Sequence, residues 1–211
     1  MRSSPRPRRL TQEQRSAETR ARLLNATIQS LVDAGYARTT TTRVCEIAGL
    51  SRGAQIHHFR TRTELVTAAL EHLARRRVEE FQKRFDEMRA KITDGHDLHE
   101  AWFELLWEVS SGDLFIATLE IWVAARTDPQ LREQILPLEQ EIGRMALAPE
   151  YTVGAERRDD RRARDLTDLA YHLARGITLV RILSPDDSRR RRQVELFKQL
   201  VVSSLDRAEP E

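Results

Sequence analysis

The segment that decides the fold is TTTRVCEIAGLSRGAQIHHFRTRTEL, residues 40–65. Apolar residues at helical spacing follow its threonines, which predicts a short helix ending at Ala48. The sequence Gly49-Leu50-Ser51 then interrupts the pattern, because glycine ends helices and serine caps the next one. A second short helix is expected over residues 52–59. Two short helices joined by a glycine turn are typical of a helix-turn-helix, whose second helix can enter a DNA major groove.

Helical patterns also flank this segment. On its N-terminal side, the spacing of apolar residues predicts a helix over 13–34 that ends at Gly35. Residues 1–12, rich in arginine and proline at the start, are expected to form a disordered basic arm. On the C-terminal side, a long helix is expected to begin near Thr63 and to end between Met88 and Ile92.

The rest of the chain also reads as helical, since no segment alternates apolar and polar residues as a strand does. Further helices are expected over 98–109, 113–127, 130–147, 164–183 and 187–207, with a charged loop over 149–164. The sequence therefore predicts an all-α fold of about nine helices.

Charge is distributed unevenly along the chain. Residues 1–62 contain twelve arginines, no lysine and four acidic residues, which gives a net charge of +8. Residues 63–211 contain 23 basic and 29 acidic residues, which gives −6. A basic segment joined to an acidic one is typical of a polyanion-binding module attached to a part that does not bind polyanions. A basic tail alone would give the same asymmetry, so the motif has to decide between the two interpretations.

Composition makes several classes of protein unlikely candidates. No apolar run approaches the roughly 18 residues that a membrane span needs, and no apolar segment follows the basic N-terminus as in a secretory signal. The single cysteine, Cys45, cannot form an intramolecular disulfide, which agrees with a reducing compartment. We therefore expect a cytoplasmic protein that does not associate with membranes. Complete metal-ligand sets, phosphate loops and nucleophile elbows are also missing, so we expect no metal, no cofactor and no enzymatic activity.

Residues 40–65 resemble the signature of the tetracycline-repressor-like (TetR) family of bacterial regulators nearly end to end. The matching residues are Gly35-Tyr36, Ala48-Gly49-Leu50-Ser51, Gly53-Ala54, His58-Phe59 and Glu64-Leu65. The resemblance implies an N-terminal three-helix helix-turn-helix DNA-binding domain over residues 13–62. It also implies a larger helical domain for effector binding and dimerisation over residues 63–211.

The expected DNA contacts follow from both chemistry and resemblance. Hydroxyls and helix N-terminal amides suit phosphates, a charged side chain at the start of the second helix can reach a guanine edge, and small residues beside it admit that helix deeply into the groove. These roles are assigned to Thr40, Thr41 and Ser51 (phosphate), Arg52 (base), and Gly53 and Ala54 (close approach).

Further phosphate contacts are expected from the resemblance alone. His57 and His58 lie at positions where the family has phosphate contacts, and Arg62 lies where the family usually has a lysine. The family commonly has Leu-Tyr where this chain has Gln55-Ile56, so the tyrosine contact with phosphate is missing. Gln55 is assigned to the DNA-binding set as a contact with adenine, although a surface glutamine without a DNA contact explains it equally well.

The C-terminal helices contain many aromatic residues. Aromatic residues at helical spacing are most often core, but the resemblance implies a pocket for a small apolar or amphipathic effector. The candidate lining residues are Trp102, Phe103, Leu106, Phe115, Leu119, Trp122, Tyr171, His172 and Arg175.

Apolar stripes along the last two helices, with Gly176 permitting close approach, require partner helices, either within the chain or in a second copy. The resemblance implies a homodimer through these helices. We therefore expect a sequence-specific repressor of transcription that binds near-palindromic double-stranded operator DNA and is released by a small-molecule effector. The alternatives are a constitutive DNA-binding or protein-interaction regulator without an effector, and an enzyme that uses the C-terminal pocket.

Overall fold

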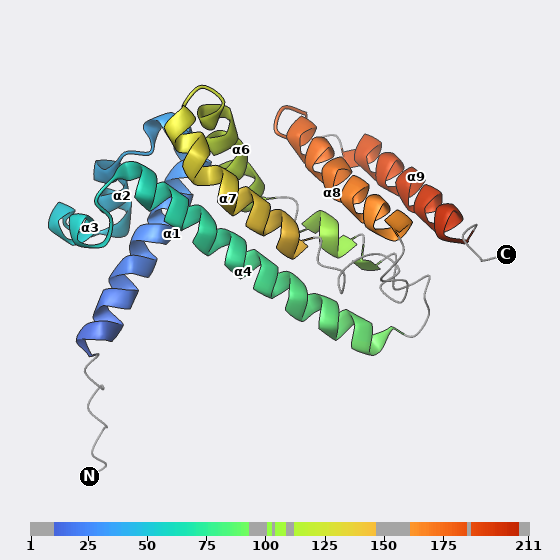
Figure 1. The fold of residues 1–211 in the computed structure, drawn as a ribbon, viewed down its shortest axis with the longest axis horizontal. Helices are drawn as coiled ribbons and strands as arrows, with labels where there is room; N and C mark the ends of the chain where they lie inside the picture. Colours follow the sequence, from blue (N-terminus) through green and yellow to red (C-terminus); the bar gives the residue numbers. More distant parts are fainter. Residues whose placement is uncertain are drawn as a thin grey trace, which may run out of the picture. The chain divides into compact units, whose positions relative to one another are not determined.

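A computed structural model describes residues 11–92, 101–102, 104–108, 112–146, 161–184 and 187–206. All regular structure in these ranges is helical, as Figure 1 shows, and the expected all-α fold of about nine helices is confirmed. Within the same ranges, no helix is both long and apolar enough to cross a membrane. Phe103, most of the predicted basic arm and most of the predicted 149–164 loop lie outside the described residues.

The chain divides into two compact units, Met1–His72 and Leu73–Glu211. This division falls after the 62/63 boundary that the resemblance implies. The physical reason is that the first turns of α4 (Arg62–Lys91) belong to the core of the first unit, where Leu65, Val66 and Leu70 are buried.

Helix α1 (Gln12–Arg38) begins with a capping box. The Thr11 hydroxyl accepts a hydrogen bond from the backbone N–H of Gln14 at 3.2 Å, and the Gln14 side chain accepts one from the backbone N–H of Thr11 at 2.9 Å. The predicted stop at Gly35 appears as a kink, since Gly35 has φ 76° and helical residues resume after it. A positive φ of this kind favours glycine because it has no Cβ.

The two short helices of the motif are α2 (Thr41–Ala48) and α3 (Arg52–His58). Thr40 and Ser51 are their N-caps, and Gly49, with φ 60°, ends α2 in the left-handed conformation. The turn between them is fixed to α1 by Arg22, whose guanidinium donates to the carbonyl oxygen of Ala48 at 2.6 Å. The expected helix-turn-helix is therefore present, with Ser51 as the predicted cap of its second helix and one of the four threonines, Thr40, as the cap of its first.

The core of the first unit joins α1, α2 and the start of α4. Cys45 is buried there, and burial raises the pKa of its thiol. A thiol of this kind is a poor nucleophile. The largest fully buried apolar side chains of this core are Leu23, Leu24, Leu31, Val44, Leu65, Val66 and Leu70.

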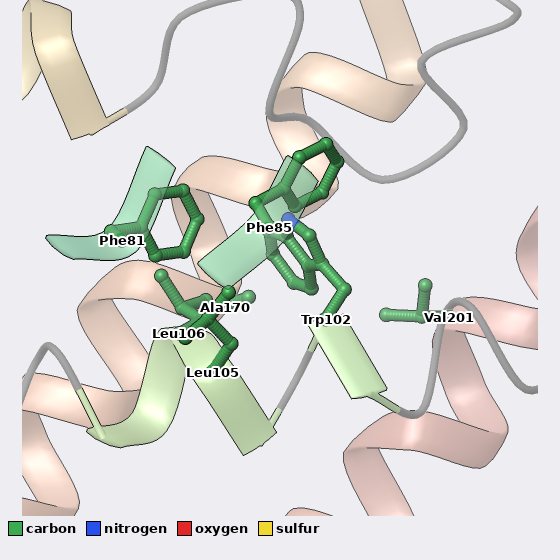
Figure 2. Packing of buried hydrophobic residues seen from close by; sticks show 7 residues of the cluster. All are labelled: Phe81, Phe85, Trp102, Leu105, Leu106, Ala170 and Val201. Carbon is green, nitrogen blue, oxygen red and sulfur yellow. The ribbon is translucent and has the colours of Figure 1, made fainter. Parts of the chain in front are cut away.

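The second unit contains the later part of α4, helical residues 101–102 and 104–108, and helices α6 (Asp113–Ala125), α7 (Pro129–Ala146), α8 (Arg161–Arg181) and α9 (Asp187–Asp206). Its largest described apolar cluster draws side chains from α4, the 101–108 stretch, α8 and α9 (Figure 2). The cluster consists of Phe81, Phe85, Trp102, Leu105, Leu106, Ala170 and Val201.

Candidate functional site

One face of α3 carries an arginine and an isoleucine that reach solvent. Arg52 is exposed, and in the described part of the chain its side chain makes no hydrogen bond or ion pair. Ile56 follows four residues later and is 52 % exposed. Residues four apart lie on the same side of a helix, so the two side chains form one mixed basic and apolar surface. Ile56 was not among the residues predicted to contact DNA, although its spacing of four residues from Arg52 indicates that the two share one face of the helix.

Thr40 and Ser51 are exposed, and each uses its hydroxyl to begin a helix. The Thr40 oxygen accepts from the backbone N–H of Arg43, and the Ser51 oxygen accepts from that of Ala54, both at 3.2 Å. A hydroxyl can still donate its proton while it accepts such a bond, so both remain able to bind a phosphate oxygen. Thr41, also predicted to contact phosphate, is half-buried.

Gly53 lies on the exposed side of α3 and Ala54 is half-buried. A Cβ built on Gly53 would meet only the Ser51 hydroxyl, at 3.8 Å, which is ordinary van der Waals contact. Packing within the described part of the chain therefore does not require a glycine at this position. A small residue there leaves room for something that approaches α3 from outside.

The structure corrects the assignment of Gln55 to the DNA-contacting set. Gln55 is 2 % exposed, and its side-chain amide donates to the carbonyl oxygen of Phe59 at 2.6 Å. The side chain thus bonds a carbonyl at the end of α3 from inside the unit and cannot reach a base from this position. The reason is that α3 is only two turns long, so its sequence pattern alone did not reveal which side is covered.

Arg62 binds the end of α1. Its guanidinium donates to the carbonyl oxygens of Tyr36 and Thr39, the latter at 2.6 Å, and lies over the Tyr36 ring at 4.0 Å. These contacts occupy the half-buried side chain within the first unit, a role that sequence reasoning did not foresee. The predicted phosphate contact of Arg62 stays a prediction.

His57 and His58 end α3. His57 is exposed and His58 is half-buried, with ring centroids 5.1 Å apart in an edge-to-face arrangement. Burial lowers the pKa of His58, and positive charge on His57 and Arg20 lowers it further. The neutral form of His58 is therefore favoured in the free protein, and it can act as a neutral hydrogen-bond donor.

A second constellation lies in the C-terminal unit, where α6, α7 and α8 bring Trp122, Glu139, Tyr171 and Arg175 together. The Arg175 guanidinium carbon lies 4.2 Å from the Trp122 ring centroid and 4.8 Å from that of Tyr171. Glu139 also accepts a hydrogen bond from the Trp122 indole. Three of the four residues were predicted, whereas Glu139 was missed. The spacing could have indicated Glu139, because it follows the buried Ile135 by four residues and so lies on the apolar side of α7.

The other predicted effector residues are distributed differently. Trp102 and Leu106 belong to the apolar cluster of Figure 2, Phe115 is buried, and Leu119 is half-buried. The side chain of His172 is 64 % exposed, and its ring bonds the backbone of Asp168 within α8. Its assignment to the effector pocket stays a prediction.

A separate groove of about 610 Å³ lies between α9 and the 104–108 stretch. It is lined by Glu104, Trp107, Arg191, Arg192, Val194, Glu195, Leu196, Lys198 and Gln199, none of which was a predicted effector residue. Much of its wall is an exposed face of α9.

Burial changes the pKa of two residues of the second constellation. Burial raises the pKa of Glu139, against the lowering effects of the Trp122 hydrogen bond and of Arg175. Burial also raises the pKa of Tyr171. The Glu139 carboxylate is thus poorly solvated, and its interactions with Trp122 and Arg175 only partly offset the cost of burying its charge. No group of three or more His, Cys, Asp or Glu side chains within the described ranges could hold a metal ion.

Comparison with known proteins gives consistent results. The family described as "Bacterial regulatory proteins, tetR family" matches residues 23–69, which include α2 and α3. An uncharacterized HTH-type transcriptional regulator of Mycobacterium tuberculosis is 30% identical over 196 residues, which cover 92% of this chain and 98% of the relative. The HTH-type transcriptional regulator CymR of Pseudomonas putida is 32% identical over 187 residues, which cover 87% of this chain and 89% of CymR.

The fold is also similar to that of a solved structure. A transcriptional regulator from Pseudomonas aeruginosa PAO1 superposes with a TM-score of 0.71 at 23% sequence identity. The superposition covers 95% of this chain and 94% of that protein. The similarity therefore extends beyond the helix-turn-helix to the helices that follow it.

Proposed function

The chain belongs to the TetR family of bacterial regulatory proteins, and on this premise we propose that it is a repressor released from its operator by a small-molecule effector. As a member of the family it is a DNA-binding transcriptional regulator. The repressor assignment and effector release follow from the resemblance, and the cytoplasm, where bacterial DNA lies, is the proposed site of action.

The proposed reading surface is the outer face of α3. Arg52 is suited to a guanine, because a guanidinium can bond O6 and N7 of that base together. Ile56 is suited to the methyl group of a thymine. The hydroxyls of Thr40, Thr41 and Ser51, together with His57 and His58, would bond phosphates and fix the register. The observation that carries this assignment is the exposed pair Arg52 and Ile56 beside a glycine that internal packing does not require.

The proposed assembly is a homodimer through α8 and α9, which lie side by side (Figure 1). Leu169, Gly176 and Val180 follow one another on α8 at spacings of seven and four residues, and Leu183 lies just after the helix ends. All four residues are exposed. A Cβ on Gly176 would meet nothing within 4 Å, so a neighbouring helix could approach closely there. Leu196 and Leu200 add an exposed apolar pair on α9.

Two copies would present two α3 helices to a near-palindromic operator, with half-site centres about 34–36 Å apart or at a larger spacing.

A small apolar or amphipathic effector is assigned to the second unit. Helix α4 supports a link between the two functions, because it runs without interruption from Arg62 in the first unit to Lys91 in the second. Effector binding would shift the α4 helices and separate the two reading surfaces, to the extent that the effector prefers that state.

The test is to select the DNA sequences that the purified protein binds and to measure the affinity of variants for the selected site. Arg52→Ala should weaken binding about tenfold or more and relax the preference at one base pair, because one bidentate contact contributes about 1–3 kcal/mol of discrimination. Arg132→Ala, which removes an exposed arginine of α7, is the matched control and should leave the affinity unchanged. Equal affinity of Arg52→Ala and the native protein at every salt concentration would rule out α3 as the reader.

A further inference from the structure

The cluster of Trp122, Glu139, Tyr171 and Arg175 is built like a site for a cation. Two aromatic rings from different helices lie close to one guanidinium, at 4.2 and 4.8 Å from ring centroid to carbon. These distances are within the range of a cation–π interaction, in which the negative face of a ring attracts a positive charge. The guanidinium that occupies this place belongs to the chain itself. Figure 1 shows α6, α7 and α8, the helices that contribute the four side chains.

Glu139 adds an unsatisfied acceptor to the cluster. Its Oε1 atom is buried and, within the described part of the chain, has no hydrogen-bond partner. The nearest cation is Arg175, at 3.8 Å from Oε2, which is too long for a hydrogen bond. A buried acceptor without a donor is costly, so a ligand with N–H bonds to offer to Oε1 would be stabilised here.

We propose that these four residues form a ligand site for a planar organic cation, an amidinium or guanidinium on an apolar body, which replaces the Arg175 guanidinium beside Trp122 and Tyr171. This inference rests on the proposed function, because it names the chemical class of the effector assigned to the second unit. The ligand's head group would stack on the two rings and donate to Glu139, while Arg175 moves out toward solvent. Arg175 is then a competitor built into the chain, which lowers the apparent affinity for the ligand.

The charges of the cluster favour a cation over an anion. The side chain of Glu139 is 18 % exposed and that of Arg175 is 19 % exposed, so neither is strongly hydrated. The unsatisfied buried atom belongs to the acid, whereas no nitrogen of Arg175 is both buried and unpartnered. An anion would have to approach Glu139 and the negative faces of two rings. A cation with N–H donors satisfies all three groups together.

Three probes with the same ring and different head groups test this proposal. Benzamidine is a planar cation with N–H donors, benzamide is its neutral counterpart and benzoate is its anionic one. Titration calorimetry on the full chain without DNA should give benzamidine an affinity about tenfold or more above those of benzamide and benzoate. Glu139→Gln should weaken benzamidine binding about tenfold or more, and Arg175→Met should strengthen it, because the competing guanidinium is gone.

Matched variants separate the site from general effects on folding. Tyr171→Phe keeps the ring and should leave benzamidine affinity within about twofold, whereas Tyr171→Leu removes the ring face and should weaken binding. Glu133→Gln, at an exposed position of the same helix as Glu139, should leave binding unchanged. Thermal melts of each variant establish that the protein is folded in the calorimeter.

Two results would overturn the proposal. One is benzoate binding that Arg175→Met abolishes, which would make the cluster an anion site. The other is the failure of benzamidine to bind both the native protein and Arg175→Met. Operator release is measured separately, by adding benzamidine to the protein–DNA complex. If benzamidine binds and the variants change its affinity as expected, but the protein stays on the operator, the cation site is supported and effector-controlled release is contradicted.

Discussion

At the scale of single residues, neighbours in α3 have opposite environments. Arg52 and Ile56 reach solvent, whereas Gln55, between them, is buried and bonds the backbone of Phe59. The helix thus presents one side to solvent, the side proposed to read DNA, and is held to the core by the other. A substitution at Gln55 should therefore act on stability, and one at Arg52 on DNA affinity.

Gln55→Ala should destabilise the protein while leaving its preference among DNA sequences unchanged. The substitution leaves the carbonyl of Phe59 without its partner and opens a cavity, which together should lower the free energy of unfolding by about 2–4 kcal/mol. Urea denaturation measures this change. Gln55→Leu, which refills the volume without restoring the hydrogen bond, should recover part of the loss. A base preference that changes in Gln55→Ala without loss of stability would contradict the buried role.

At the scale of helices, a polar side chain links the end of α1 to the start of α4. Arg62, the first residue of α4, bonds the carbonyls of Tyr36 and Thr39 at the end of α1 and stacks on the Tyr36 ring. These carbonyls follow the kink at Gly35, where the regular helical hydrogen bonds are interrupted. The contact therefore sets where α4 begins relative to the helix-turn-helix.

Arg62→Lys tests whether this contact or a phosphate contact is the main role of the residue. Lysine keeps the charge but has no planar fork, so it should lose a carbonyl bond and the stacking on Tyr36. We expect the free energy of unfolding to fall by about 1–2 kcal/mol, as urea denaturation would measure. The dependence of DNA affinity on salt should stay the same. Arg62→Gln should also keep the native salt slope; a smaller slope would indicate a phosphate contact.

Helix α7 contributes a carboxylate whose burial costs stability. Because the folded protein raises the pKa of Glu139 above its ordinary value of 4.5, folding favours the protonated acid. Below that value both the folded and the unfolded states hold the proton, and there is no penalty. As pH rises from 4.5 toward the folded pKa, the unfolded state loses its proton first, and stability is lost.

Glu139→Gln should remove this penalty, since the amide is neutral at every pH in the window. Its melting temperature should exceed that of the native protein at about pH 7.5, and the difference should shrink at about pH 5. Glu133→Gln, at an exposed position, should show no such trend. A melting temperature of Glu139→Gln below the native value at the higher pH would mean that the attraction to Arg175 outweighs the cost of burial.

At the scale of the whole molecule, the proposed homodimer determines whether two reading helices act together. Gly176 lies among exposed apolar residues of α8, where an added side chain would meet open space within the chain. A large charged residue there would be harmless to a single copy and would obstruct a second one.

Gly176→Arg should therefore convert a dimer into monomers without loss of folding, as sedimentation velocity and circular dichroism would measure. Loss of the second half-site should weaken operator binding about 100-fold or more, because linked sites gain affinity through effective concentration. Gln134→Arg adds the same residue to an exposed position of α7 and should leave both properties unchanged. A Gly176→Arg protein that sediments as a dimer would place the interface elsewhere.

The sequence by itself determined the helical class, a threonine cap before α2, the cap at Ser51, the glycine that ends α2 and the family to which the chain belongs. These features are local, because a cap, a left-handed glycine and a run of spaced apolar residues each act within a few positions of the chain. Their physical causes are present in any short segment, so a pattern of residues suffices to identify them.

Only the tertiary structure decided the environments of Gln55, Arg62 and Glu139. Gln55 is buried because one side of α3 packs against α1 and α2, and Arg62 bonds carbonyls 23 and 26 residues earlier in the chain. Glu139 is 36 residues before Arg175 in sequence, yet packing of α7 and α8 brings their charges to 3.8 Å. The physical reason is that burial and charge pairing depend on which surfaces meet, and helical periodicity does not specify the partner of a surface.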